Sequence, residues 1–385
     1  MKKILLILRS LPYPVDRDGL SVINYRLLSM SPMNYKFDII SLSEENGDTI
    51  SKTKIINEHI DQVIIIPDKA MNSSFGRLFR LIKRFLGFRG AVYDEYICKH
   101  KKKYDLVYVC VPPSVLYLSI KDFGIPTFVN AVDSFSMLNL RFYNYHKTIF
   151  GGVKYYLYRK VEKKCFKYPD VISFVSSVDT EFSKKFLDRL NVVTIHNGVD
   201  CIYYNYNRKI EREKNSLLFV GNYRNVSNAI GVNNFVKNIF PLIKKVVPEV
   251  KLYIVGPHAN FSFDDPNVIV TGFVDDLRDY YGKCTVFIAP LLTGSGIKNK
   301  VLEAMAAGIP VISSSIGIDG IDVENGYHLL VADEVTQWRD MIVDLLNNSQ
   351  KRDYLANNAQ IYVKDNYDWN TVIEQYFSQF SSLLK

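Results

Sequence analysis

The chain has 385 residues, of which 48% are hydrophobic and 23% are charged. This composition excludes collagen-like, coiled-coil and largely disordered proteins, and the length suffices for roughly two or three domains. Lysine and arginine exceed aspartate and glutamate by 48 to 40, a net charge of +8. Because the sequence contains no recognisable basic module, we expect no nucleic acid as a partner. An anionic membrane surface and a phosphorylated substrate both stay open.

The N-terminal residues predict a buried strand rather than a targeting segment. Lys2-Lys3 followed by Ile4–Leu8 resembles a signal peptide, but its apolar part is shorter than the about 7–15 residues of a real one. No apolar run in the sequence approaches the roughly 18 residues that cross a bilayer. The 5 cysteines lie far apart without zinc-ligand spacing. Together these features favour a reduced, metal-free, cytoplasmic protein.

Short apolar segments alternate with stretches of helical periodicity along the chain. One series of predicted strands covers residues 3–8, 36–41, 62–67, 105–110, 127–131, 171–176 and 192–196. A second series covers residues 216–220, 251–255, 267–270, 285–289, 310–314 and 327–331. Such strands alternating with helices predict an α/β fold with doubly wound parallel sheets.

A polar, charged segment without apolar periodicity, Asp200–Asn215, separates the two series. We therefore predict a Rossmann-like domain over residues 1–200, a linker over 201–215 and a second Rossmann-like domain over 216–366. The final helix, within residues 367–385, is expected to pack back on the first domain. Ligands of such sheets bind at the carboxyl ends of the strands, so the expected site is a cleft between the domains.

Residues 290–317 carry the clearest chemical pattern, PLLTGSGIKNKVLEAMAAGIPVISSSIG. A strand ends at Pro290, a tight loop follows, and a helix is predicted over residues 298–307. Small residues let a ligand approach the backbone, and a helix N-terminus offers unpaired N–H groups with partial positive charge, so this arrangement suits a phosphate. The loop consists of Gly294, Ser295, Gly296 and Ile297.

Charged side chains accompany this loop. Lys298 and Lys300 supply cations near the helix N-terminus, and Glu303 follows one turn later, where a carboxylate can accept hydrogen bonds from ribose hydroxyls. The alternative is an ordinary loop beside a solvated glutamate, and a short glycine-rich motif alone does not separate the two. The ordered set of loop, lysines, glutamate and following strand is much rarer by chance.

Residues 290–317 resemble the donor-binding signature of glycosyltransferase family four, which comprises retaining, nucleotide-sugar-dependent enzymes. Further segments match the family in the same order, among them HNGVD at 196–200, LLFVGNYRNVSN at 217–228 and VTGFVDDL at 270–277. The similarity covers about half the chain, essentially the second domain. It implies the GT-B fold, in which two Rossmann-like domains face each other across a cleft.

The resemblance also implies which residues bind the donor. Glu303 corresponds to the ribose-binding glutamate, and Phe273 and Val274 to positions near the base, although Phe273 alone could equally be a core residue. Lys298 and Lys300 are the expected catalytic cations. The full donor set is Gly19, Gly221, Asn222, Arg224, Phe273, Val274, Gly294, Ser295, Gly296, Ile297, Lys298, Lys300, Val301 and Glu303.

In the second domain the sequence departs from the family twice. Ser295 stands where many relatives have a first glutamate, so contacts to the sugar must differ. Asn222 and Asn228 stand near positions that are basic in many relatives, with Arg224 displaced from them. We therefore assign the diphosphate charge to Lys298, Lys300 and Arg224.

In the first domain the departures concern two strand ends. Gly19 matches one of two family glycines and Asp18 replaces the other; an ordinary turn with Asp18 near a helix N-cap is the alternative. Val132 and Asp133 stand where many relatives place a histidine. Asp133 is a third catalytic candidate, orienting the sugar or the acceptor, and a capping aspartate is the alternative.

Basic and aromatic residues interleave at Phe75–Arg89, FGRLFRLIKRFLGFR. At helical spacing one face is apolar, with basic residues around it. The apolar residues are Phe75, Leu78, Phe79, Ile82 and Phe85, and the basic ones are Arg77, Arg80, Lys83, Arg84 and Arg89. Such a helix can lie on an anionic membrane. Alternatively, its apolar face packs on the first domain.

The sequence therefore predicts an enzyme that moves a sugar from a nucleoside diphosphate sugar to a hydroxyl of a glycan, lipid-linked or protein acceptor. Cell-surface polysaccharide or lipopolysaccharide synthesis is the expected setting, in the cytoplasm or at the inner face of the membrane, and retention is implied by the resemblance alone. No cofactor or metal is expected, because helix N–H groups and lysines can neutralise the leaving diphosphate. The alternative is a catalytically degenerate GT-B subunit that binds a sugar or stabilises a partner.

Overall fold

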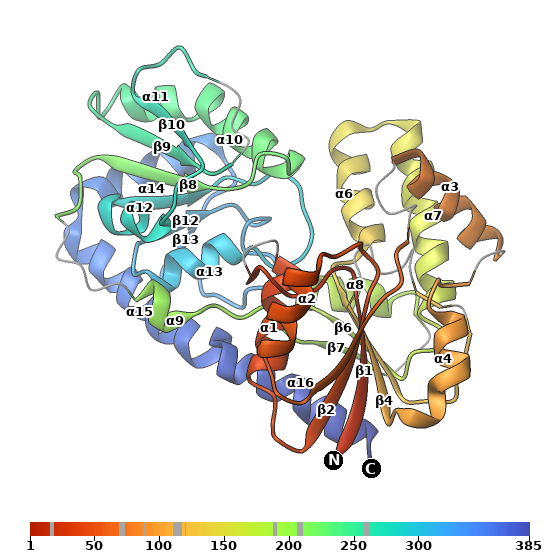
Figure 1. The fold of residues 1–385 in the computed structure, drawn as a ribbon. Helices are drawn as coiled ribbons and strands as arrows, with labels where there is room; N and C mark the ends of the chain where they lie inside the picture. The colour runs from red at the N-terminus through yellow and green to blue at the C-terminus, as the bar shows by residue number, and fades with distance from the viewer. Residues whose placement is uncertain are drawn as a thin grey trace. The chain divides into compact units, whose positions relative to one another are not determined.

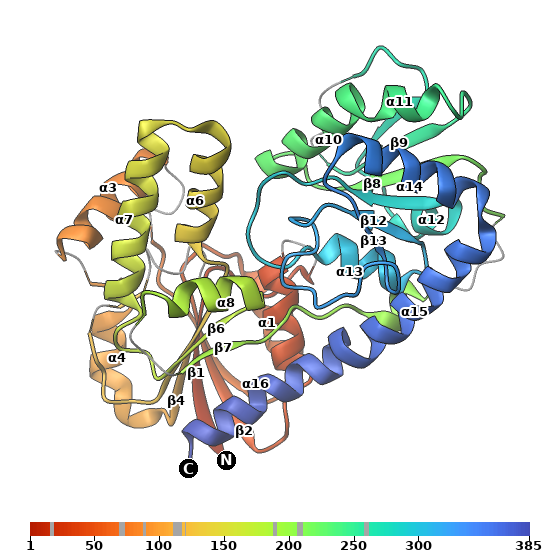
Figure 2. The same ribbon diagram turned by 180° about the vertical axis from the view of Figure 1, so that it is seen from behind.

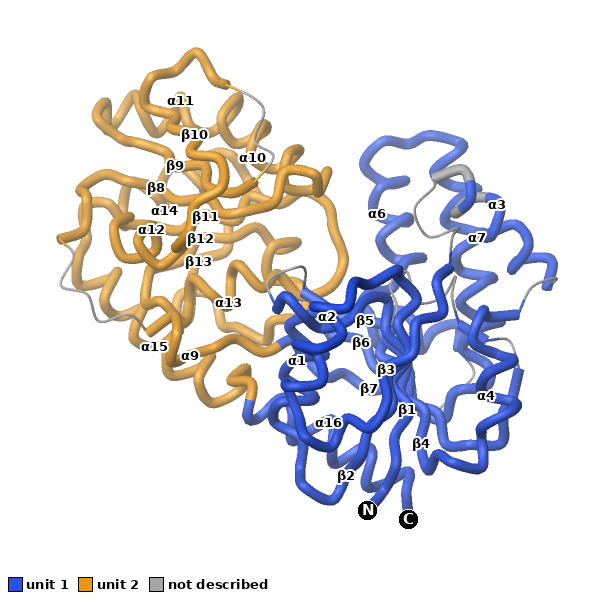
Figure 3. Tube along the Cα trace, in the orientation of Figure 1, with its two compact units in different colours: residues 1–197, 370–385 blue, residues 198–369 orange. Residues whose placement is uncertain are grey.

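The structure, a computed structural model, describes residues 1–15, 19–68, 74–87, 90–110, 118–119, 121–187, 191–205, 211–257 and 262–385. Figure 1 and Figure 2 show alternating helices and strands along the whole chain. The chain forms two compact units (Figure 3): Met1–Asn197 with Asn370–Lys385, and Gly198–Trp369. Within the described ranges, no helix combines the length and apolar character that crossing a membrane requires.

The first unit is built on a 7-stranded parallel sheet in the order β3-β2-β1-β4-β5-β6-β7. Its strands are β1 (Lys2–Leu8), β2 (Tyr35–Ser41), β3 (Ile60–Ile65), β4 (Leu106–Cys110), β5 (Thr127–Val132), β6 (Val171–Phe174) and β7 (Val192–Thr194). Its helices are α1 (Gly19–Ser29), α2 (Gly47–Ile55), α3 (Ser74–Leu86), α4 (Asp94–His100), α6 (Phe135–His146), α7 (Ile149–Cys165), α8 (Ser177–Lys184) and α16 (Trp369–Leu383), with a 3-10 turn at Lys101–Lys103.

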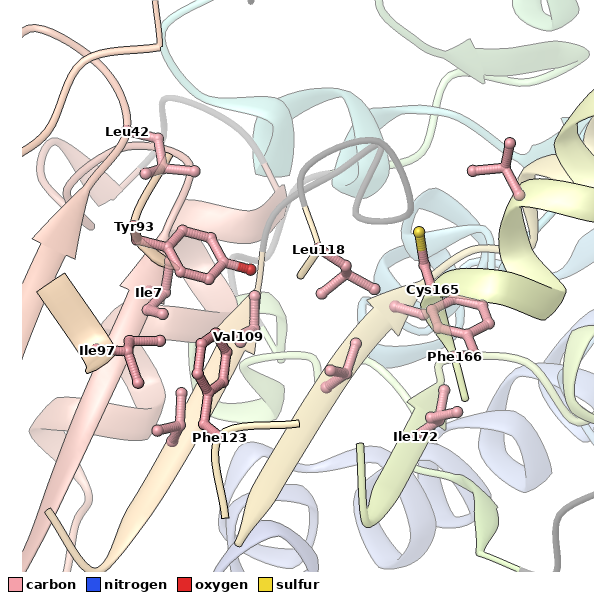
Figure 4. Close-up of a cluster of buried hydrophobic side chains, with 14 of the residues drawn as sticks. Ile7, Leu42, Tyr93, Ile97, Val109, Leu118, Phe123, Cys165, Phe166 and Ile172 are labelled. Carbon is pink, nitrogen blue, oxygen red and sulfur yellow. The ribbon is translucent and has the colours of Figure 1, made fainter. Parts of the chain in front are cut away.

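Helices cover both faces of this sheet. On one face, Ile97 of α4 and Cys165 of α7 belong to the same buried cluster as Val109 of β4 (Figure 4). On the other face, Phe380 of α16 lies edge-on to Phe128 of β5, with ring centroids 5.3 Å apart. The C-terminal helix thus completes the core of the N-terminal unit.

The second unit contains a 6-stranded parallel sheet in the order β10-β9-β8-β11-β12-β13. Its strands are β8 (Ser216–Val220), β9 (Lys251–Val255), β10 (Val268–Gly272), β11 (Val286–Ala289), β12 (Val311–Ser313) and β13 (Leu330–Val331). Its helices are α9 (Cys201–Tyr204), α10 (Val226–Asn238), α11 (Phe240–Lys244), α12 (Leu277–Lys283), α13 (Asn299–Ala306), α14 (Val335–Asn347) and α15 (Ser349–Tyr367).

The predicted α/β class with two doubly wound parallel sheets is confirmed, and both series of predicted strands are present. The described part of the polar segment that suggested a linker, residues 201–205 and 211–215, lies within the second unit. Where the chain passes between units, Val199 pairs with Asp368 in a parallel bridge, and the Val199 N–H donates to the Tyr367 carbonyl over 2.8 Å.

Helix α3 corrects the amphipathic pattern predicted for residues 75–89. Arg80 and Arg84 are only 3% and 1% exposed, whereas Phe79 is 53% exposed. Arg80 is buried because Asp68 supplies a carboxylate, with Arg80 Nη2 donating to Asp68 Oδ1 over 2.7 Å. The expectation that Arg80 and Arg84 face outward is therefore wrong. The side chains of Phe75, Arg77 and Leu78, and all of Arg89, lie outside the described residues.

Candidate functional site

The second sheet has a topological switch point between β8 and β11. These strands are neighbours, but the chain continues from β8 to one side of the sheet and from β11 to the other. At such a point the loops after the two strands diverge and leave room for a ligand at the carboxyl edge. Gly221 and Asn222 directly follow β8, and Gly294–Gly296 follow β11. The two predicted donor loops therefore share one edge of one sheet.

The loop after β8 is held close to its neighbours. The Gly221 N–H donates to the Val255 carbonyl over 2.9 Å, and the carbonyl of Asn222 accepts from Asn228 Nδ2 over 2.8 Å. A Cβ atom on Gly221 would lie 2.8 Å from Asn228 Nδ2 and 3.0 Å from Lys300 Nζ. Only glycine permits this approach. Asn222 and Arg224 are exposed, so their side chains can reach a ligand at this edge.

Lys300, on the first turn of α13, lies beside this loop. Its ammonium donates to Asn228 Oδ1 over 2.6 Å and sits 4.6 Å from the centroid of the Phe219 ring. Burial lowers the pKa of Lys300 to about 7, and the positive charge of Lys298 acts in the same direction. An anion bound here would reverse that shift, since an opposite charge favours the protonated amine.

The carboxylate of Glu303 is held by two tyrosines. Tyr281 of α12 donates to Glu303 Oε2 over 3.1 Å, and the hydroxyl of Tyr204 in α9 also hydrogen-bonds to the carboxylate. Burial raises the pKa of Glu303, while these hydrogen bonds and the charge of Lys300 oppose the rise. Glu303 is therefore oriented and partly buried, and the interpretation as a solvated helix carboxylate is wrong.

The glycine-rich loop after β11 adopts backbone conformations that suit glycine. Gly294 has φ 138° and Gly296 has φ 67°. The ammonium of Lys298 donates to the carbonyls of Ser295 and Gly296 over 2.9 and 2.5 Å. Lys298 therefore holds the loop itself, whereas Lys300 lies toward the loop after β8.

Helix α13 begins directly behind this loop. Its N-cap residue is Lys298, which makes no side-chain capping hydrogen bond. The first N–H groups of a helix have no partner within the helix, and together with the helix dipole they attract phosphate. The side chain of Val301 is fully buried, so within the predicted donor set it contributes through its backbone and its packing; Ile297 is 8% exposed.

The loop after β10 presents an exposed aromatic ring. Phe273 is 73% exposed, so the alternative that it belongs to the core is wrong. Val274 is half-buried. Asp276 caps α12 by accepting from the Arg278 N–H over 2.9 Å. The predicted base-binding position is thus an accessible ring at the same carboxyl edge.

The remaining predicted site residues lie in the first unit. Gly19 is the exposed first residue of α1, and Asp18 lies outside the described residues. Asp133 follows β5, directly after Val132, which has φ 63°. That left-handed conformation is strained for a β-branched residue and is common at functional sites. Ser134 is the N-cap of α6, so the alternative that Asp133 caps this helix is wrong.

Two buried carboxylates hold the loop that carries Asp133. Glu162 Oε1 accepts from the N–H groups of Phe135 and Ser136 over 2.8 and 3.2 Å, and Asp179 Oδ1 accepts from the Ser134 N–H over 3.0 Å. Burial raises the pKa of Glu162 to about 7, against the hydrogen bonds from Ser136 and Phe135.

Sequence reasoning missed Tyr204, Tyr281, Glu162 and Asp179 as site-supporting residues. The one available signal was the Tyr203-Tyr204 pair inside an otherwise charged segment. For the others, the supporting contacts join residues from different elements, such as Glu162 and Phe135. Across the described ranges, no cluster of three or more histidine, cysteine, aspartate or glutamate residues could hold a metal ion.

The family match lies within the second unit, whereas the similarity to single proteins extends beyond it. Residues 214–348 match the family Glycosyl transferases group 1. The "Uncharacterized 44.6 kDa protein in cps region" of Klebsiella pneumoniae is 25% identical, over 98% of this chain and 100% of its own length. The "Capsular polysaccharide biosynthesis glycosyltransferase CapM" of Staphylococcus aureus is 23% identical, over 61% of this chain and 67% of its own.

Solved structures resemble the whole chain. Sucrose-phosphate synthase from Thermosynechococcus elongatus has a TM-score of 0.72 at 16% identity, covering 100% of this chain and 99% of its own. HepE from Anabaena, solved in complex with UDP and glucose, has a TM-score of 0.66 at 14% identity, covering 98% and 99%. With the domain match at the switch-point loops and glycosyltransferases among its relatives, the chain is a glycosyltransferase of the GT-B fold that carries a Glycosyl transferases group 1 domain.

Proposed function

We propose that this glycosyltransferase moves a sugar from a nucleoside diphosphate sugar to a hydroxyl acceptor, with retention of anomeric configuration. The observation that carries the proposal is the pairing of Lys300 with Asn228 at the switch point, one helical turn before a glutamate held by two tyrosines. A cation beside a helix N-terminus suits a diphosphate, and an oriented carboxylate suits the two hydroxyls of a ribose. Retention follows from the family resemblance.

Lys300 and the N-terminus of α13 act on the leaving group. Negative charge grows on the diphosphate as its bond to the sugar breaks, so groups that stabilise this charge lower the barrier more than they tighten binding. Lys300 reaches this position already partly desolvated, and a bound diphosphate would favour its protonated form. Glu303 accepts ribose hydrogen bonds, and the exposed ring of Phe273 packs against the base.

Asp133 orients the sugar or the acceptor from the first unit. The buried carboxylates of Glu162 and Asp179 hold its loop, with the strained backbone at Val132, in one conformation. A side chain that must be placed accurately benefits from such support, because catalysis depends on small distances between reacting groups.

The proposed setting is the synthesis of capsular or other cell-surface polysaccharide, including lipopolysaccharide, in the cytoplasm at the inner face of the membrane. Relatives from a cps region and from capsular polysaccharide biosynthesis support this setting. The acceptor is a glycan, with lipid-linked and protein acceptors as the alternatives. A lipid-linked acceptor would make attachment to the membrane surface useful.

The experiment is a panel of nucleoside diphosphate sugars incubated with the purified protein, with release of nucleoside diphosphate as the readout. Wild type should turn over one donor, and Lys300→Met should lose most of this activity. Lys237→Met, which removes an exposed lysine of α10, is the matched control and should behave as wild type. Binding of a donor without turnover, with or without an acceptor extract, would instead indicate the degenerate sugar-binding subunit. Absence of any binding would overturn the proposed donor site.

A further inference from the structure

The hairpin of α6 and α7 ends in a turn that exposes large apolar side chains. Every residue from Asn144 to Phe150 is exposed, and within the turn Ile149 and Phe150 are 89% and 65% exposed. One helical turn later along α7, Val153 is 50% exposed. Residues 147–153 are called the hairpin tip below. Leaving such side chains in water is unfavourable, so a cluster of them marks a surface that binds something.

The hairpin tip has a defined conformation. Lys147 ends α6 with φ 52°, and its N–H donates to the Tyr143 carbonyl over 2.7 Å. Thr148 begins α7 as its N-cap and accepts from the Gly151 N–H over 3.2 Å. The apolar side chains of Ile149, Phe150 and Val153 therefore project from the capped start of α7, and their presentation costs little ordering on binding.

The hairpin carries nearly all the net charge of the chain. Residues 135–168 contain eight lysines and arginines and a single acidic residue, Glu162, which is buried. The segment thus contributes a net of seven positive charges to a chain of net charge +8. Lys160 and Lys163, two and three turns beyond the tip, are exposed on α7. A basic surface without exposed acids selects an anionic partner.

Helix α3 lies beside α7 and also exposes apolar side chains (Figure 1). It packs along α7, as both views show (Figure 1 and Figure 2), with the ring centroids of Phe85 and Tyr156 6.3 Å apart. Tyr156 is itself 52% exposed. Because α3 buries Arg80 and Arg84, it exposes Phe79 and Leu86 instead, each at 53%. Exposed apolar side chains thus occur on both α3 and α7, which touch at the Phe85–Tyr156 contact.

Lysines on this surface lie over aromatic rings. Lys160 Nζ is 5.5 Å from the centroid of Tyr156, and Lys83 Nζ is 4.5 Å from that of Phe79. Aromatic rings combined with long basic side chains are typical of the boundary between lipid tails and headgroups. A soluble polyanion would bind the lysines but leave Ile149 and Phe150 in water.

We propose that the hairpin tip inserts into the headgroup region of an anionic bilayer, with Ile149 and Phe150 entering the lipid and Lys147 and the lysines of α7 contacting lipid phosphates. This inference rests on the proposed function only in that a lipid-linked acceptor would make it useful; the surface itself is read from the first unit alone. The proposed membrane contact therefore lies on the hairpin of α6 and α7, and not on the outward-facing arginines predicted for residues 75–89.

The test is flotation with vesicles of phosphatidylcholine containing phosphatidylglycerol, against vesicles of phosphatidylcholine alone. Wild type should float with the anionic vesicles, and less so as salt rises. Ile149→Asp/Phe150→Asp should lower the vesicle-bound fraction about ten-fold or more, because both apolar side chains lose their transfer to lipid. Ile55→Asp, at an isoleucine of α2 that is 81% exposed, is the matched control and should float as wild type does.

Insertion itself is read by fluorescence. The two tryptophans, Trp338 and Trp369, are 2% and 5% exposed, so they report little of the surroundings. In Phe150→Trp, emission should shift to the blue on addition of anionic vesicles, whereas Ile55→Trp should show no shift.

Failure of wild type to float at low salt overturns the proposal. So does equal flotation of wild type and Ile149→Asp/Phe150→Asp. The proposal is also overturned if Ile149→Asp/Phe150→Asp loses binding to dextran sulfate and Phe150→Trp shows no blue shift on vesicles. The partner would then be a soluble polyanion.

Donor binding is measured on the same variants. Since no residue of the hairpin tip belongs to the predicted donor set, Ile149→Asp/Phe150→Asp should bind the nucleoside diphosphate as wild type does. A wild-type protein that floats but binds no donor would contradict the proposed function but not the proposed insertion of the hairpin tip. A wild-type protein that binds the donor but does not float would contradict only the proposed insertion of the hairpin tip.

Discussion

The ammonium of Lys300 lies 2.6 Å from Oδ1 of Asn228, so a lysine from the helix after β11 contacts a side chain from the helix after β8. The contact joins the two loops that flank the switch point of the second sheet. It also keeps Lys300 beside a neutral partner in a desolvated position, where its pKa is lowered to about 7. A phosphate ligand would therefore bind most strongly to the enzyme with Lys300 protonated, which is only part of the population near pH 7.

Binding of the nucleoside diphosphate should accordingly be coupled to proton uptake. The pKa of Lys300 lies near 7 without ligand and rises when an anion binds, so affinity should fall as pH rises through about 7. Titration calorimetry near pH 7.5, in two buffers of different ionisation enthalpy, should detect a fraction of a proton taken up.

Lys300→Met supplies the check on this coupling. The variant should bind without proton uptake and turn over about 10²–10³-fold more slowly, the usual effect of removing one group that stabilises the charge of a transition state. Lys237→Met should retain both the proton uptake and the rate. Equal proton uptake by wild type and Lys300→Met would assign the titration to another group.

The two tyrosines on Glu303 should contribute to donor binding without touching the donor. Tyr281→Phe removes the 3.1 Å hydrogen bond to Glu303 Oε2 and leaves the packing of the ring. Losing a hydrogen bond to a charged group costs about 1.5–3 kcal/mol, so we expect donor affinity to fall by about ten-fold or more. Tyr280→Phe, at the neighbouring and half-buried tyrosine, is the control. Equal donor dissociation constants for the two variants would show that Glu303 needs no such support.

Gly221 should tolerate no side chain if the loop after β8 is part of the donor site. In Gly221→Ala the new Cβ would lie 2.8 Å from Asn228 Nδ2 and 3.0 Å from Lys300 Nζ, so at least one of these side chains must move. Donor binding and turnover should both fall while circular dichroism stays that of wild type. Gly47→Ala has nothing within 4 Å of its new Cβ and should change neither. Wild-type kinetics in Gly221→Ala would remove this loop from the site.

The fold could be predicted because parallel strands covered on both faces leave an unmistakable pattern. Strands such as β8, Ser216–Val220, and β9, Lys251–Val255, occupy the predicted residues because they are short and apolar after their first residue. The donor loops could be predicted for a related reason, since a strand, a glycine-rich loop and a helix are contiguous in the sequence.

The supporting residues could not be predicted, because they come from separate elements. Tyr204 lies among charged residues that suggested a linker, and its contact with Glu303 depends on how the chain returns to the second sheet. On α3, periodicity identifies two faces but not which one is covered. There the ion pair with Asp68, from beyond β3, buries Arg80 and exposes Phe79.

Glu162 should make the stability of the first unit depend on pH in a direction opposite to that of most carboxylates. Its pKa is raised by burial from 4.5 to about 7, so the folded state favours the protonated form. This contribution is fully present below about pH 4.5 and is lost as pH rises through about 7, at about 1.4 kcal/mol for each unit between the two pKa values.

Glu162→Gln cannot titrate, so the difference in unfolding free energy between wild type and variant should shrink from about pH 5 to about pH 8. Urea unfolding at both pH values measures it, with Glu181→Gln, at an exposed residue of α8, as the control. A difference that stays constant or grows with pH would mean that the hydrogen bonds from Phe135 and Ser136 outweigh burial and keep Glu162 ionised.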